Sequence, residues 1–106
     1  MGIYIVTFTI AQKTTRYGDY NARYNSVIEA VRGTVSAGGT YWDETTSFLL
    51  LQSDLDSSKA VAGQIDQNSK FDPADDLLVV INLSKKGYTV LGDYTDKDID
   101  KIMSLR

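Results

Sequence analysis

Paired acids in the middle of the chain are the residues whose types could most directly do chemistry. Asp43 and Glu44 are adjacent within a segment rich in strand-forming residues, and are expected at the tip of a hairpin. Two carboxylates so placed could act as general acid and general base, or bind a hard cation through oxygen. Alternatively, charge at an exposed turn keeps the neighbouring apolar run from aggregating. Asp43 and Glu44 are therefore the candidate catalytic residues, although the sequence places no third ligand beside them.

Two groups of aspartates later in the chain resemble parts of calcium sites. They are Asp72, Asp75 and Asp76, which flank Pro73, and the alternating Asp96, Asp98 and Asp100. Aspartate and proline are also the expected residues of a turn, which explains the first group without a metal. In the second group Lys101 occupies the position at which a calcium loop requires glycine. We therefore predict no metal site and no cofactor, with Mg²⁺ or Mn²⁺ required only under a nuclease hypothesis.

The composition excludes several kinds of active site. The 106 residues include no cysteine and no histidine. Disulfides, thiolate nucleophiles, zinc–thiolate sites, serine–histidine pairs and imidazole ligands are therefore excluded. No apolar run approaches the roughly 20 residues that span a bilayer, and the Met-Gly-Ile-Tyr start lacks the features of a secretory signal. We accordingly expect a cytoplasmic protein with no membrane partner.

Basic and aromatic residues alternate near the first loop and the first helix. Lys13, Arg16 and Arg23 are interleaved with tyrosines, and are the candidate nucleic-acid-binding residues. Positive charge beside aromatic rings suits a surface that follows a nucleic-acid backbone and stacks on bases. The net charge of −3, however, provides no global attraction to nucleic acid. The alternative is a solvated loop followed by a helix whose Tyr20 and Tyr24 face the core.

Hydrophobic periodicity predicts the elements of the first 84 residues. They are a strand at Ile3–Ile10, a helix capped by Asp19 that runs to Val35, a hairpin of Tyr41–Glu44 and Ser47–Gln52, a helix at 57–67 capped by Asp56, and a strand at Leu77–Leu83. In the first helix, Arg23 falls off the apolar stripe. This β-α-β-β-α-β order is that of the ferredoxin-like fold, an α+β sandwich.

Residues 85–106 form a C-terminal extension to a ferredoxin-like domain of residues 1–84. A short strand is expected at Tyr88–Leu91, followed by a helix capped by Thr95. The extension provides an edge strand that could pair within the chain or with a second copy.

The sheet of this fold has one face that its two helices leave open. Ile3 and Ile5 are expected on that face, where exposed apolar residues need a cover. A second protomer is an economical cover, so we predict a homodimer. Its interface would include Ile3, Ile5, Tyr88 and Val90. The alternative is a C-terminal extension that packs on its own domain.

Three segments of the chain resemble a known family. IYIVTFTI, GGTYWDETTSFLLLQSD and DDLLVVINL, in this order, are similar to the small CRISPR-associated ferredoxin-like endonuclease family of the spacer-acquisition complex. The similarity spans roughly residues 3–92 and is closer to stand-alone bacterial relatives that are not tied to a CRISPR locus. It implies a homodimer whose last short strand crosses to the partner's sheet. It also implies nucleic-acid contact, as a metal-dependent nuclease or as an architectural subunit.

The metal-binding aspartate of this family follows an aromatic residue at the end of the first strand. Here that motif falls on Phe8 and Thr9, so the acid is replaced by threonine. Since Mg²⁺ is usually held through carboxylates, the replacement predicts a dimeric, non-catalytic accessory that binds nucleic acid or a partner. One alternative is a metal-dependent endonuclease, for DNA or RNA, that uses Asp43 and Glu44. The other is an antitoxin-like or regulatory protein-binding domain.

Overall fold

The chain folds into a five-stranded antiparallel sheet with three helices, and the computed structural model describes residues 1–106. In chain order the elements are β1 (Gly2–Thr9), α1 (Tyr20–Arg32), β2 (Tyr41–Trp42), β3 (Phe48–Ser53), α2 (Ser58–Gln67), β4 (Leu77–Asn82), β5 (Tyr88–Gly92) and α3 (Asp98–Met103). The first six follow the predicted βαββαβ order. The fold is therefore α+β and ferredoxin-like, with an extra C-terminal strand and helix, as expected from the sequence.

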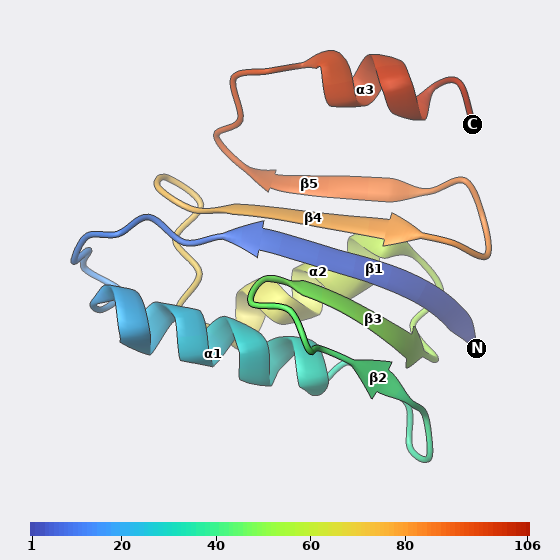
Figure 1. Ribbon diagram of the computed structural model, residues 1–106, viewed down its shortest axis with the longest axis horizontal. Helices are drawn as coiled ribbons and strands as arrows, with labels where there is room; N and C mark the ends of the chain where they lie inside the picture. Colours follow the sequence, from blue (N-terminus) through green and yellow to red (C-terminus); the bar gives the residue numbers. More distant parts are fainter.

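The strands lie side by side in the order β2-β3-β1-β4-β5 (Figure 1). β1 is central and pairs antiparallel with β3 on one side and β4 on the other. β5 pairs with β4 of the same chain, so that Val79 lies opposite Val90. α3 runs alongside β5, at the edge of the sheet away from β2.

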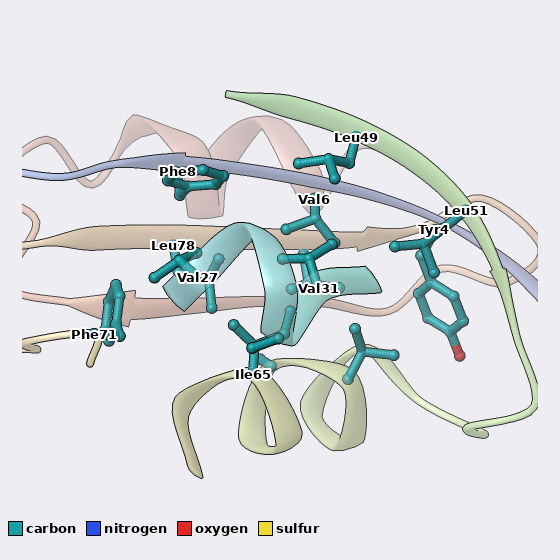
Figure 2. Packing of buried hydrophobic residues seen from close by; sticks show 14 of the residues in the cluster. Tyr4, Val6, Phe8, Val27, Val31, Leu49, Leu51, Ile65, Phe71 and Leu78 are labelled. Carbon is teal, nitrogen blue, oxygen red and sulfur yellow. The ribbon is translucent and has the colours of Figure 1, made fainter. Parts of the chain in front are cut away.

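The core lies between the sheet and the two longer helices. Alternate residues of β1, namely Tyr4, Val6 and Phe8, are buried, and side chains from α1 and α2 cover them. Figure 2 shows Val31 of α1 and Ile65 of α2 packed beneath the strands, together with side chains of β3 and β4. The period of two in the strands and of 3.6 in the helices thus directs apolar side chains to one layer.

The helix boundaries agree with the sequence at one cap and differ at two. Asp19 caps α1 as predicted, because its carboxylate accepts a hydrogen bond from the Ala22 N–H. α2 is capped by Ser57 rather than Asp56, since the extended Ser57 places its hydroxyl against the Ala60 N–H. Thr95 does not cap α3; that helix begins after Lys97, which makes no side-chain capping hydrogen bond.

Two predicted elements are shorter than expected. α1 ends at Arg32 instead of Val35, because the N–H groups of Thr34 and Val35 bond to carbonyls only three residues back, as in a tightening last turn. The first strand of the hairpin stops at Trp42, and Asp43 leaves the ladder to pair with Arg32 of α1.

Candidate functional site

The face of the sheet opposite α1 and α2 carries a row of apolar side chains that crosses every strand. The pairing register places Trp42 beside Leu50, Leu50 beside Ile5, and Ile5 beside Ile81. Ile81 in turn lies beside Tyr88 of β5. Leu50, Ile5 and Ile81 alternate with buried core residues along their strands, so they point away from the helices. Trp42 and Tyr88 lie directly opposite two of them in the register and share their face. We call this side of the sheet the open face.

A second row lies next to the first on the open face. It runs from Phe48 through Thr7 and Val79 to Val90. Trp42 joins the two rows, because its ring meets that of Phe48 edge-on at a centroid distance of 6.3 Å. Ile3 and Trp42 are each 43% exposed. The open face is therefore a continuous apolar surface with large side chains in contact with solvent, a feature typical of association sites.

The predicted interface residues all belong to this surface. Ile5, Tyr88 and Val90 lie in the two rows, and Ile3 lies next to Ile5's row at the start of β1. The sequence did not point to Leu50, because Phe48–Leu51 is apolar at every position and shows no alternation. Only the burial pattern of β3, in which half-buried and buried residues alternate, places Leu50 on the open face.

α3 covers only the β4–β5 side of the open face. Ile99 and Ile102 of α3 line a cavity of about 500 Å³ against Leu77, Val79 and Val90. No residue of α3 is buried, and Ile102 is 61% exposed. The helix is therefore an incomplete lid over one edge, and the β1–β3–β2 side has no cover within the chain.

α3 is anchored through Asp100, whose carboxylate accepts hydrogen bonds from two tyrosine hydroxyls. The Tyr88 hydroxyl lies 2.5 Å and the Tyr94 hydroxyl 2.9 Å from its oxygens. These hydrogen bonds, first from Tyr88 and then from Tyr94, lower the pKa of Asp100 below its usual value, while nearby Lys97 acts in the same direction. The pKa values of Tyr88 and Tyr94 are raised, chiefly by the same hydrogen bonds. Asp100 therefore has a structural role as an acceptor.

Arg23 is the most deeply buried charged side chain, which corrects the expectation that it lies off the apolar stripe of its helix. Its side chain and that of Asp76 have no solvent exposure, and the guanidinium forms an ion pair with the carboxylate. The guanidinium also donates to the carbonyls of Lys13, at 2.5 Å, and Ala11, at 3.3 Å. Asp76 accepts from the N–H groups of Ala11 and Asp72, each at 2.9 Å. Arg23 thus joins the loop after β1 to the start of β4.

The other two members of the predicted basic cluster lie at the surface. Lys13 pairs with Asp75, its Nζ lying 2.6 Å from the carboxylate. The Arg16 guanidinium sits 5.0 Å from the centre of the exposed Tyr17 ring. With Arg23 buried and Lys13 paired, the three residues do not form one exposed basic surface.

The candidate acids Asp43 and Glu44 have different surroundings. The Asp43 carboxylate accepts from Arg32 Nε at 3.1 Å and Nη2 at 2.6 Å. This hydrogen bonding raises the pKa of Arg32. Glu44 is exposed and makes no side-chain hydrogen bond or ion pair. Asp43 therefore fastens the β2–β3 loop to α1 and is not free to work jointly with Glu44.

Two further aspartates of the calcium-like groups serve local structure. Asp72 accepts from the Ala74 N–H and Asp96 from the Asp98 N–H. No group of three or more acidic side chains gathers in a way that could hold a metal ion. Thr9 is exposed on the open face beside Leu77. No helix is long and apolar enough to cross a membrane.

No protein-family model, curated protein or solved structure matches the chain. The similarity to the CRISPR-associated family therefore remains a prediction that rests on the three sequence segments, and the open face is the site that the geometry itself defines.

Proposed function

We propose that the protein is a homodimeric association module that pairs through the open face of its sheet. The observation that supports this proposal is the apolar row that runs from Trp42 through Ile5 to Tyr88 across all five strands. Large apolar side chains that remain in water cost free energy of about 25 cal/mol for each Å². A second copy that presents the same face would remove both surfaces from water at once.

Four of the carboxylates fit this non-catalytic proposal. Asp43, Asp75 and Asp76 each hold a basic side chain, and Asp100 holds two tyrosines. Each carboxylate therefore has a structural partner that accounts for its position. On this proposal the protein acts as an accessory that presents a dimeric surface, as the stand-alone relatives of the CRISPR-associated family are expected to do.

The family similarity adds a route by which such a dimer could be joined. β5 follows β4 after the turn 83–87 and pairs with it in the same chain. In a swapped dimer the same backbone hydrogen bonds would form with β4 of the other copy. The open face would still be the surface that is covered.

The test is the oligomeric state of the purified protein. We expect a dimer in sedimentation velocity at micromolar concentration. Ile5→Lys and Trp42→Lys each place a charge in the apolar row and should yield monomers. Asn25→Lys, on the exposed side of α1, adds the same charge elsewhere and should remain dimeric. Because Trp42 lies at an exposed position of a short strand, its variant should fold even if Ile5→Lys does not. A wild-type monomer at all accessible concentrations would refute the proposal.

Nucleic-acid binding is a second candidate, favoured by one observation. Arg16 and Tyr17 are both exposed and stacked, which is the arrangement that base-stacking surfaces use. A gel shift with single-stranded RNA at low salt should be lost in Arg16→Ala. Lys97→Ala removes a similar cation from above Tyr94 and is the matched control. No shift of the wild-type protein at low salt would exclude this function.

A further inference from the structure

The C-terminal unit of β5 and α3 carries opposite charges at its two ends. The basic end, beside the β4–β5 turn, consists of Lys85, Lys86 and Arg106. Arg106 is held there because its guanidinium donates to the carbonyls of Lys85 and Gly87, each at 3.2 Å. The acid end, beyond Gly92, consists of Asp93, Asp96 and Asp98, all of which border the cavity beneath α3. All six charged side chains are exposed.

None of these six charges is neutralised by an ion pair within the chain. The ion pairs of the protein are Lys13–Asp75, Arg23–Asp76 and Arg32–Asp43.

Other charged side chains lie near each end, but they do not reverse the sign of its net charge. Lys97, at the acid end, donates to the Tyr94 carbonyl and lies over the Tyr94 ring, so it offsets part of the negative charge there. Asp54 and Asp56 border a hollow with Lys85 near the basic end, but neither forms an ion pair with it. Each end therefore keeps an excess of its own charge.

Two copies that meet through their open faces can be related by a two-fold axis in either of two principal directions. If the axis runs along the strands, the acid ends of both copies come to the same end of the dimer. If the axis lies in the interface and runs across the strands, β5 of one copy lies over β5 of the other in the opposite direction. The acid end of each copy then meets the basic end of its partner.

We propose that the dimer has this second arrangement, with the acid end of each copy facing the basic end of the other. The inference rests on the proposed homodimer and specifies the orientation of its two copies. Of the two arrangements, only this one brings the acid end of one copy onto the basic end of the other, and opposite charges at a rim fix the register.

Charge reversal tests this orientation. Lys85→Glu/Lys86→Glu makes the basic end acidic, and Asp93→Lys/Asp96→Lys makes the acid end basic. Each double variant alone should dimerise at least tenfold more weakly than wild type at low salt, and the difference should shrink as salt is added. Lys59→Glu/Lys70→Glu changes the net charge as much as Lys85→Glu/Lys86→Glu does, but at exposed positions elsewhere, and should dimerise like wild type.

Mixing the two double variants supplies the decisive measurement. In the mixed dimer every reversed end meets a complementary end, so native mass spectrometry should show the heterodimer in large excess, with an affinity near that of wild type. A chain that carries all four substitutions should recover homodimer formation for the same reason. If the wild-type protein is dimeric but the mixture shows no preference for the heterodimer, the orientation is wrong while the homodimer stands. If the wild-type protein is monomeric, the proposed function itself fails.

Discussion

Arg23 can keep its charge in the interior because its guanidinium donates hydrogen bonds to the Asp76 carboxylate and to two backbone carbonyls. The pair links three segments that are distant in the sequence, namely the loop after β1, helix α1 and the start of β4. Since neither side chain meets solvent, loss of one partner leaves the other charge buried and unpaired.

We therefore predict that Arg23→Met lowers the free energy of unfolding by about 3–5 kcal/mol. Arg32→Met is the matched control, because Arg32 pairs with Asp43 at a half-exposed site and should cost no more than about 1 kcal/mol. Urea denaturation of both variants measures the difference. Equal losses would show that burial of the Arg23 pair does not matter to stability.

Asp100 provides a prediction of pH dependence. Its pKa is lowered below the ordinary 3.8 by hydrogen bonds from Tyr88 and Tyr94, so its stabilising contribution is fully present above that ordinary value. The contribution is lost as the pH falls through the lower pKa of the folded protein, where the carboxylate becomes protonated. An NMR titration should find this lowered pKa. Tyr88→Phe should move it toward the ordinary value, whereas Tyr17→Phe should leave it unchanged.

Residue roles were the least predictable part of this chain. Arg23 looked like a surface cation because helical periodicity alone cannot show that Asp76, far along the sequence, arrives beside it. Asp43 looked like a candidate catalytic acid for the same reason, since its partner Arg32 comes from another element. Asp19 was predictable because its hydrogen bond to Ala22 is local.

Replacing either of two glycines by alanine should change the stability of the protein, in opposite directions. Gly92 ends β5 with φ +113°, and a Cβ there would lie 2.2 Å from the carbonyl oxygen of Asp76. Gly92→Ala should therefore destabilise the protein by more than about 1 kcal/mol. Gly63 lies inside α2 with open space around its Cα, so Gly63→Ala should stabilise by about 0.5–1 kcal/mol. Thermal unfolding distinguishes the two, and a shift of the same sign in both would contradict the argument.

The order of the elements was predictable because each has a strong local period. β1, β4 and α2 fall within a residue or two of their expected ranges. The predicted start of α3 was wrong. Thr95 has the residue type of a cap, but the chain reaches helical geometry only after Lys97. Cap type is a local signal, whereas α3 is held against β5 by the hydrogen bonds of Asp100 with Tyr88 and Tyr94.

At the scale of the whole molecule, Trp42 reports on association. It is the single tryptophan of the chain and is 43% exposed on the open face. If the open faces pair, its fluorescence emission should shift to shorter wavelength as the protein concentration rises through the dissociation constant. Ile5→Lys should keep a concentration-independent emission. If the emission maximum of the wild-type protein stays at long wavelength at all concentrations, the interface does not include Trp42.

The open face itself followed from the sequence in outline. An antiparallel sheet with both helices on one side leaves its other side bare, and Ile3 and Ile5 indicated that this side is apolar. The extent of the surface did not follow, because Trp42 and Leu50 join it only through the register of β2 with β3. Registers depend on pairing between strands and are not contained in the pattern of either strand alone.

The central position of β1 has a consequence for synthesis on the ribosome. β1 pairs only with β3 and β4, and the last of these ends at Asn82. β1 is apolar and leaves the exit tunnel before both of its partners, so its second edge stays unpaired until β4 has been made. Nascent chains that stall before Asn82 should be bound by chaperones, and release beyond that point should let the sheet close in a single late step.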